Sequence, residues 1–173
     1  MITFHKNQKG LLKTETQDKN GWINVICITK KEKKFLLKEL QIPKAFDKDI
    51  EDIDERTRIE IADGWYLLIL RIPFKSDDAK LPFNTALMRL VFKDDVFVSL
   101  TFHKTDILYD FVLYTQRKKI EIENDFDLVL KLLLSSSIWF LKYLKQINQR
   151  IKFAEDNLEK SIENLELQAL LQI

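Results

Sequence analysis

The stretch that decides the fold runs from Asp125 to Ile173 and reads DFDLVLKLLLSSSIWFLKYLKQINQRIKFAEDNLEKSIENLELQALLQI. It contains neither glycine nor proline, and its apolar residues recur every three or four positions, which is typical of an amphipathic helix. At about 1.5 Å rise per residue, an unbroken helix of this length extends on the order of 70 Å. A compact domain of this size is roughly half as wide. We therefore predict a long C-terminal helix that projects from the body.

The two halves of this stretch differ in polarity. Its first half is mostly apolar, whereas its second half carries charged residues around an apolar stripe. We therefore expect the helix to begin inside a core and to end outside it. The last residues, Leu170 to Ile173, continue the apolar pattern without a capping glycine. This ending favours a chain cut from a longer one; the alternative is a natural tail that pairs with another copy.

The composition sets limits on the class of protein. A chain of 173 residues fits one domain plus an extension, and 46% hydrophobic residues are enough for a core. The net charge of +1 argues against a nucleic-acid binder that works by neutralising phosphates. The start of the chain does not resemble a signal peptide. The longest apolar run, residues 128–144, is interrupted by Lys131 and Lys142, so it falls short of the ~20 apolar residues of a membrane span.

Upstream of the long helix, the sequence predicts a set of short strands and helices. Residues 22–28 are almost continuously apolar, as in a strand covered on both faces. Thr29 and Glu32 then form a capping box for a helix, and Asp63-Gly64 is a strong hairpin signal. The expected strands are 2–5, 11–16, 22–28, 58–61, 65–74, 83–92 and 96–102, and the expected helices are 30–40, a short one from Ile42-Pro43, and 106–117.

These elements predict an α/β fold. A mixed sheet of six to seven strands is sandwiched by helices, as an α/β/α arrangement, and its last four strands form an antiparallel meander. We assign residues 1–124 to an α/β domain. Residues 125–173 are the long helix, which completes the domain and leads away from it.

The sequence lacks the motifs of the common enzyme classes. There is no glycine-rich phosphate loop, nucleophile elbow or H-E-x-x-H zinc motif. His5 and His103 are far apart and have no metal ligand at suitable spacing, so structural roles are favoured for both. We interpret Cys27 as a small core residue of a buried strand, and residues 135–137, three serines, as a place where another helix can approach. The chain is not expected to be an enzyme.

Acidic residues are the remaining functional candidates. They fall in three groups: the segment from Asp47 to Glu55, the pair Asp77 and Asp78, and a helical stripe of Glu155, Glu159, Glu163 and Glu166. Neighbouring carboxylates repel one another, and a divalent cation such as Mg²⁺, which prefers oxygen ligands, relieves that repulsion. The alternative is that these groups are solvated surfaces balanced by lysines, and that the stripe pairs with a partner helix.

The order of several motifs resembles a known family. Trp22-Ile-Asn-Val25 is followed by a helix, by Ile42-Pro43, and by an acidic segment that ends in Asp54-Glu-Arg-Thr-Arg-Ile-Glu60. A strand over Leu67 to Pro73, a meander and a long helix containing Asn157-Leu-Glu-Lys-Ser-Ile-Glu-Asn-Leu come next. This order resembles the N-terminal cytoplasmic domain of the CorA family of magnesium and divalent-cation transporters. The match covers roughly residues 20–173, with Thr57 where many relatives have proline.

The resemblance implies that the full-length protein is a homopentamer in the cell membrane, and that this chain is its soluble part on the cytoplasmic side. Its membrane spans, the first ending in Gly-Met-Asn, would follow this chain, which itself would contact neither membrane nor nucleic acid. Divalent cations would bind between subunits and hold the pore closed. Asp77 or Asp78 matches the position of one family ligand, whose partner lies on a later helix. The regulatory ion would be Mg²⁺, with Co²⁺ or Zn²⁺ as alternatives, because zinc carriers share the domain.

Two hypotheses from different classes follow. In the first, the chain is the soluble regulatory domain of a CorA-like transporter, which senses the cytosolic cation and gates transport. In the second, it is a standalone oligomerisation module that uses its C-terminal helix as the interface. The identity of the ion, the direction of transport and the oligomeric state of this chain are left open by the sequence.

Overall fold

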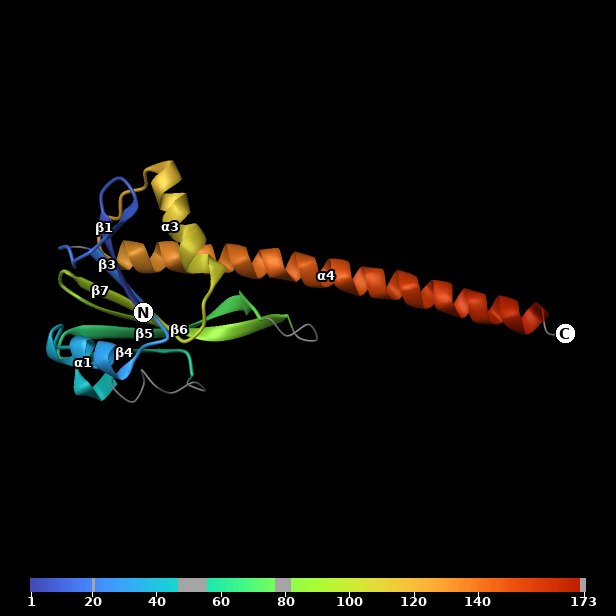
Figure 1. Ribbon diagram of the computed structural model, residues 1–173, viewed down its shortest axis with the longest axis horizontal. Coiled ribbons are helices and arrows are strands. Elements are labelled where there is room, and N and C mark those ends of the chain that lie inside the picture. Colours follow the sequence, from blue (N-terminus) through green and yellow to red (C-terminus); the bar gives the residue numbers. More distant parts are fainter. Residues whose placement is uncertain (20, 47–55, 77–81, 172–173) are drawn as a thin grey trace. The chain divides into compact units, whose positions relative to one another are not determined.

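The computed structural model describes residues 1–19, 21–46, 56–76 and 82–171. It divides into two compact units, Met1–Ser137 and Ile138–Ile173. The first unit contains a sheet and the helices that cover it, and the second is the remaining part of the last helix (Figure 1). The strands are β1 (Ile2–Asn7), β2 (Leu11–Thr14), β3 (Gly21–Ile26), β4 (Arg58–Ala62), β5 (Trp65–Lys75), β6 (Phe83–Lys93) and β7 (Val96–Thr101). The helices are α1 (Lys30–Lys38), the 3₁₀ turn η1 (Lys44–Phe46), α3 (Asp106–Lys118) and α4 (Asp125–Leu171).

The described strands form one mixed sheet of seven, in the order β2-β1-β3-β7-β6-β5-β4. Within two groups, β2-β1-β3 and β7-β6-β5-β4, all neighbouring strands are antiparallel. The two groups are joined by the parallel pair β3–β7, in which Trp22 lies opposite Phe97. The predicted α/β class and the antiparallel meander of the last four strands are therefore confirmed.

One face of the sheet is covered by α1. Leu36 of this helix is fully buried against Ile23, Val25 and other apolar side chains of the central strands. The helix begins as the sequence predicts, because the Thr29 side chain accepts from the Glu32 backbone N–H and the Glu32 carboxylate accepts from that of Thr29. Burying a side chain of this size stabilises the fold by about 1.5–3 kcal/mol.

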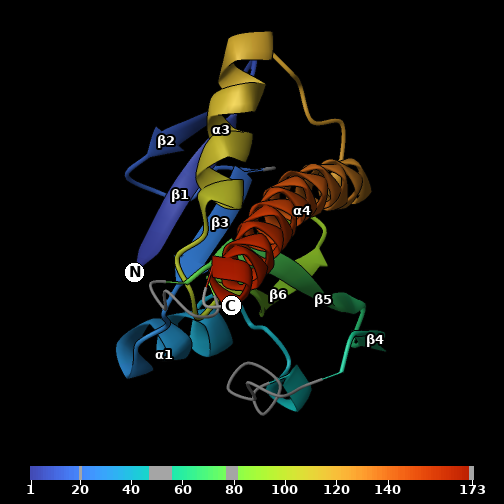
Figure 2. The same cartoon turned by 90° about the vertical axis from the view of Figure 1, so that its right-hand side faces the viewer.

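The opposite face is covered by α3 and by the first turns of α4 (Figure 2). The Trp22 ring packs edge-on against Phe111 of α3. Phe126 of α4 packs in the same way against Phe92. Beneath them, the indole Nε1–H of Trp22 donates to the Ser99 hydroxyl at 2.8 Å, and this hydroxyl donates to Asn24 Oδ1 at 3.0 Å. The helices on both faces confirm the predicted α/β/α sandwich.

The N-terminal hairpin is fastened to α3 by side-chain hydrogen bonds. The Leu11 backbone N–H donates to the Thr115 hydroxyl at 3.1 Å, and Gln116 Nε2 donates to the Leu11 carbonyl at 2.7 Å. Gly10 has a positive φ of 112°, and a Cβ there would lie 2.8 Å from backbone atoms of Thr115 and Gln116. Glycine is therefore required for this close approach.

The long helix predicted from residue 125 onward is present as α4, 47 residues from Asp125 to Leu171. Within the first unit, Leu128, Val129 and Leu132 of this helix are buried. Within the second unit, a stripe of apolar side chains is exposed along the helix: Ile151, Leu158, Ile162 and Leu165. Among the described helical residues, no stretch has both the length and the hydrophobicity of a membrane span.

The prediction for Cys27 is wrong. The strand ends at Ile26, and Cys27 is exposed with a positive φ of 51°. Its backbone N–H still donates to the Thr101 carbonyl at 2.8 Å, and its thiol donates to the Phe102 carbonyl at 2.9 Å. The chain turns at this residue toward the capping box of α1. The apolar run of the sequence therefore extends beyond the end of the strand.

Candidate functional site

The acidic pair predicted as a metal ligand lies in the sequence between β5 and β6, the two strands with the longest pairing in the sheet. Asp77 and Asp78 lie outside the described residues, as does the acidic segment 47–55. The strands that flank the pair are described: Lys75 of β5 lies opposite Phe83 of β6, and the Ser76 N–H donates to the Pro82 carbonyl at 2.8 Å. The sequence position of the pair is therefore fixed at the β5–β6 connection, and its role as a ligand stays a prediction.

The third acidic group lies on the second unit. Glu155 and Glu159 are exposed on α4, and the side chains of Glu163 and Glu166 lie outside the described part. In the portion of the chain that the structure describes, no three His, Cys, Asp or Glu side chains are grouped so that they could hold a metal ion. The described acidic residues therefore do not form a preorganised set of metal ligands.

Both histidines have packing roles. His5 is buried on β1 and stacks on Trp22 at 5.1 Å between ring centroids, and burial lowers the pKa of its imidazole. His103 follows β7 and stacks on Phe74 at 4.6 Å. The two rings belong to different parts of the sheet, as the structural interpretation of their sequence positions predicted.

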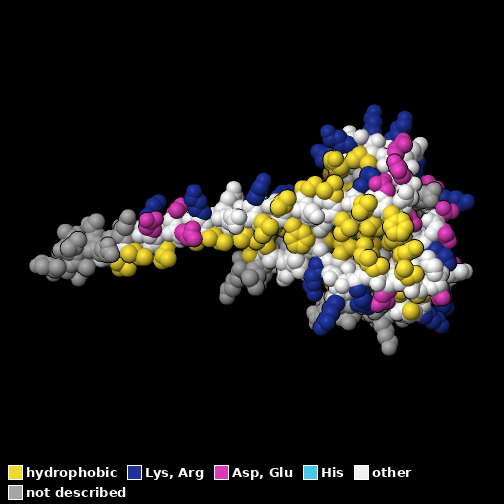
Figure 3. Space-filling view, turned by 180° about the vertical axis from the view of Figure 1, so that it is seen from behind, with side chains coloured by type: hydrophobic (Ala, Val, Ile, Leu, Met, Phe, Trp, Pro, Cys, Tyr) yellow, Lys and Arg dark blue, Asp and Glu magenta, His cyan; other side chains and the backbone are white. Residues whose placement is uncertain are grey.

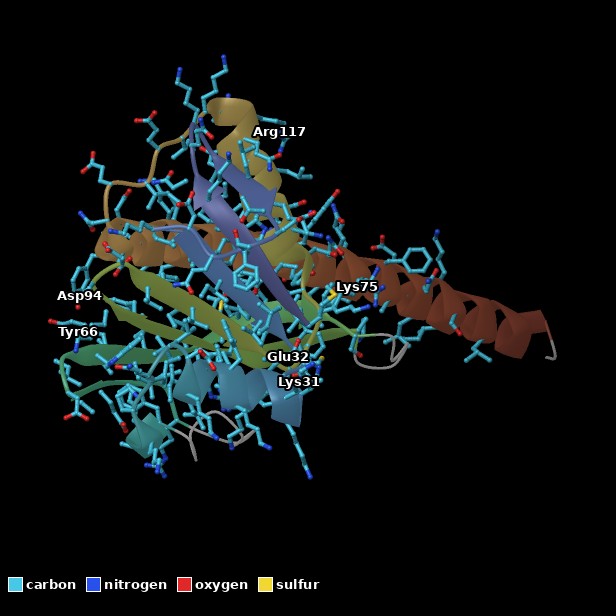
Figure 4. The ribbon with its side chains drawn as sticks, turned by 60° about the vertical axis from the view of Figure 1, so that its left-hand side comes forward. Lys31, Glu32, Tyr66, Lys75, Asp94 and Arg117 are labelled. Atoms are coloured by element: carbon cyan, nitrogen blue, oxygen red, sulfur yellow. The ribbon has the colours of Figure 1, made fainter. Side chains whose placement is uncertain are left out.

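A cavity that the sequence did not indicate lies where α4 begins. It has a volume of about 480 Å³. Its walls come from β1 and β3, from the β6–β7 turn and from the segment that enters α4, and they include Asn7, Trp22, Tyr66, Lys93, Asp94, Glu123 and Asp125. Asp94 and Tyr66 lie at one end of the sheet, and Lys75, at the other end of β5, lies far from them (Figure 4).

Asp125 has the most perturbed carboxyl group of this cavity. Its partial burial, together with the charges of Asp95 and Asp94, raises the pKa of Asp125 from 3.8 to about 6. The next acid on the helix has a different environment. Asp127 pairs with Lys131 and accepts from the Glu123 backbone N–H at 3.0 Å, and these bonds outweigh burial and lower its pKa.

Sequence reasoning missed this cluster because its members are distant in the chain. Asp94 and Asp95 form a tight turn, whereas Asp125 is the first residue of a helix. Each pattern is ordinary by itself, since aspartate favours turns and helix starts. Only the packing of the start of α4 beside the β6–β7 turn brings them together.

A further surface feature of the first unit is apolar. Ile59 and Ile61 of the edge strand β4 are 69% and 65% exposed. Ile61 lies opposite Tyr66, whose ring contacts Phe126, itself 56% exposed. Leu130 of α4 is also exposed. Figure 3 shows hydrophobic side chains gathered on this face. Contiguous apolar surface of this kind marks interaction sites in soluble proteins.

The fold places the chain in a defined structural class. It is similar to the soluble domain of CorA from Methanocaldococcus jannaschii, with a TM-score of 0.77 and 18% identity over 91% of this chain and 64% of that one. The complete CorA magnesium transporter from the same organism matches with a TM-score of 0.75 and 19% identity, over 91% of this chain and 51% of that one. The cytoplasmic domain of ZntB from Vibrio parahaemolyticus RIMD 2210633 matches with a TM-score of 0.67 and 13% identity, over 86% and 62%.

The family follows from the sequence match. The model of the CorA-like Mg²⁺ transporter protein family matches residues 17–173, and the chain belongs to this family. No curated protein sequence matches the chain. The chain spans about two thirds of the similar soluble-domain structure and about half of the complete transporter. The resemblance derived from the order of the sequence motifs is thus confirmed.

Proposed function

We propose that this chain is the regulatory, cytoplasmic domain of a CorA-like divalent-cation transporter, and that it is not an enzyme. The observation that carries the proposal is the family match over residues 17–173, supported by the likeness to soluble and cytoplasmic domains of transporters. The domain would be part of a homopentamer, on the cytoplasmic side of the membrane. We assign residues 1–124 to the α/β part and residues 125–173 to the helix that leads toward the transmembrane part.

Asp77 and Asp78 are the proposed contribution of this chain to a regulatory cation site. Two adjacent carboxylates provide the hard oxygen ligands that suit Mg²⁺, which commonly uses one or two protein carboxylates and keeps several waters. The remaining ligand would come from a neighbouring subunit. Occupation of such a site would favour the closed arrangement of the subunits, so that transport decreases as the cytosolic concentration rises.

The test uses the full-length parent protein in liposomes, with Mg²⁺ influx measured at several internal Mg²⁺ concentrations. The double variant Asp77→Ala/Asp78→Ala should transport at internal concentrations that close the unmodified protein. A matched control is Glu15→Ala/Asp18→Ala, which removes two exposed acids from the connection between β2 and β3. If internal Mg²⁺ inhibits influx equally in all three proteins, the site assignment is wrong. If the unmodified protein shows no cation flux at all, the proposed transport function is wrong.

A second candidate function is self-association through α4. The observation that favours it is the exposed apolar stripe of the second unit, in which Ile151, Leu158, Ile162 and Leu165 are each at least half exposed. Residues at this spacing occupy one face of a helix and suit pairing with another helix. The charged residues beside the stripe, such as Glu155 and Glu159, would then select the partner.

Sedimentation of the chain distinguishes the two candidates. A self-contained module should form a stable oligomer at micromolar concentration, and Leu158→Ser/Ile162→Ser should dissociate it. Lys160→Ser, an exposed change on the same helix, is the control and should leave the oligomer intact. A chain that stays monomeric, or an oligomer that the double variant leaves unchanged, would contradict the module hypothesis.

A further inference from the structure

The start of α4 is held in place by several hydrogen bonds. The Asn7 side chain donates to the Ile122 carbonyl at 2.6 Å and accepts from the Ile122 N–H at 3.2 Å, which fastens the connecting segment to β1. The Asn124 side chain then accepts from the Asp127 N–H at 3.0 Å and caps the helix. Asp125 is therefore positioned by groups on both sides of it.

The cavity beside Asp125 is predominantly acidic. The charged residues that line it are Lys93, Asp94, Glu123 and Asp125. Beside these in the chain or in contact with them are Asp95, Asp63, Asp127 and Lys131. Strands β1 and β3 contribute uncharged residues, among them Asn7 and Trp22. Lys93 Nζ donates to the Asp63 carbonyl at 2.9 Å, and Lys131 pairs with Asp127. Both nearby lysines thus have other acceptors.

The backbone of the β6–β7 turn, which carries the exposed Asp94 and Asp95, is fixed by strand pairing. Lys93 and Val96 are paired across the turn, and Asp94 has a positive φ of 50°, as tight hairpin turns require. Asp94 and Asp125 line the same cavity, and the charge of the neighbouring Asp95 also acts on Asp125. Like charges held at a fixed separation raise the free energy of the ionised form.

From this geometry we propose that the start of α4 and the β6–β7 turn form a proton-sensitive contact. With Asp125 neutral, the first turn of α4 packs against the turn. With Asp125 ionised, its repulsion from Asp94 and Asp95 loosens that packing. Burial and the two turn carboxylates place the titration of Asp125 near pH 6, so the change would fall between weakly acidic and neutral conditions. The contact does not depend on the proposed transport function, and it would persist if that proposal failed.

The first experiment measures hydrogen exchange in the unmodified 173-residue chain between pH 5 and pH 7.5. After correction for intrinsic exchange rates, amides of the first turns of α4, such as those of Leu128 and Val129, should be protected about tenfold more at pH 5 than at pH 7.5. Amides within α3, such as that of Phe111, are the internal reference and should change little. No variant is needed, so misfolding cannot affect the result.

The second experiment identifies the groups responsible. The carboxyl ¹³C signal of Asp125 should titrate with a midpoint near pH 6, and Asp94→Asn/Asp95→Asn should lower that midpoint by roughly one pH unit. Asp125→Asn should abolish the pH dependence of protection at the start of α4. The matched control is Asp106→Asn at the first position of α3, which should preserve it.

The outcomes separate clearly. Protection at the start of α4 that is independent of pH would overturn the proposal. An Asp125 midpoint that the double variant leaves unchanged would also overturn it, because repulsion by the turn would then be negligible. A pH-dependent protection that vanishes in Asp125→Asn and shifts in Asp94→Asn/Asp95→Asn would support it.

Discussion

Replacing Ser99 by alanine should destabilise the fold, because its hydroxyl connects two buried polar groups. Ser99 is fully buried, and its hydroxyl accepts from Trp22 Nε1 at 2.8 Å and donates to Asn24 Oδ1 at 3.0 Å. Both partners are buried as well, with 1% and 7% exposure. In Ser99→Ala each partner loses its hydrogen bond inside the protein. Leaving a buried polar group without a partner costs about 1–3 kcal/mol, so we expect a loss of about 2–4 kcal/mol.

Urea denaturation followed by far-ultraviolet circular dichroism measures this loss. With a slope of about 1–3 kcal/mol per molar urea, the midpoint should fall by roughly 1–2 M, and the slope itself should stay unchanged. The control is Ser137→Ala, because Ser137 is exposed and its hydroxyl donates only to the Leu133 carbonyl of the same helix. That substitution should change the stability by no more than about 0.5 kcal/mol.

A double-mutant cycle tests the physical reason. Trp22→Phe removes the indole N–H, so Ser99→Ala in that background leaves one fewer unsatisfied group and should cost about 1 kcal/mol less than in the unmodified chain. The reasoning is refuted if Ser99→Ala costs less than about 0.5 kcal/mol, or if its cost is the same in both backgrounds.

Four further predictions follow from the structure. The pKa of Asp125 is raised in the folded state to about 6, so its carboxyl contributes stability that is complete below pH 4 and is lost as the pH rises through 6. In thermal denaturation, Asp125→Asn should therefore be more stable than the unmodified chain at pH 7.5 and similar to it at pH 4. Glu32→Gln should lower the unfolding free energy by about 0.5–1 kcal/mol at pH 7, because the carboxylate of the capping box also pairs with the Met1 ammonium, and the difference should disappear at low pH. Gly10→Ala should cost more than about 1 kcal/mol in the same assay, since the new methyl group would meet the backbone of α3. Cys27 should react with a thiol reagent in the folded chain at the rate of an exposed thiol, and slow reaction that requires denaturant would contradict its placement.

The elements of the fold could be predicted because their sequence signals are local. The capping box at Thr29 and the Asp63-Gly64 hairpin need only neighbouring residues, and both are present as the patterns indicated. The absence of glycine and proline after Asp125 likewise predicted α4. At Cys27 the apolar pattern failed, because a residue with positive φ ends the strand while the apolar run continues.

Burial on α3 shows what periodicity alone cannot resolve. Tyr114 is 49% exposed although it lies beside the apolar face, whereas Thr115 is fully buried. Thr115 is buried because its hydroxyl accepts from the Leu11 N–H and donates to the Val112 carbonyl, so its polar group is satisfied without water. The hydrophobicity pattern of α3 cannot show that a distant backbone group, such as the Leu11 N–H, will bond to the Thr115 hydroxyl.

The candidate sites were harder to predict than the fold. The assignment of Asp77 and Asp78 came from the family resemblance, in which they match the position of a ligand after a strand. It stays a prediction, as does the domain boundary after residue 124. The cluster around Asp125 requires the tertiary arrangement, since β7, α3 and two connecting segments separate Asp94 from Asp125 in the chain. Proximity of like charges across a cavity has no signature in the order of residues.

The parallel pairing of β3 with β7 has a consequence for how the protein is made. The Trp22–Ser99 bond joins residues 77 positions apart, and the Leu11–Thr115 bond joins residues 104 apart. At a synthesis rate of about 5–20 residues per second, the first strands wait on the order of 5–20 s before their partners have left the ribosome. During that interval the apolar side chains of β3 are without the cover they later receive. The N-terminal hairpin is thus made first but completed late.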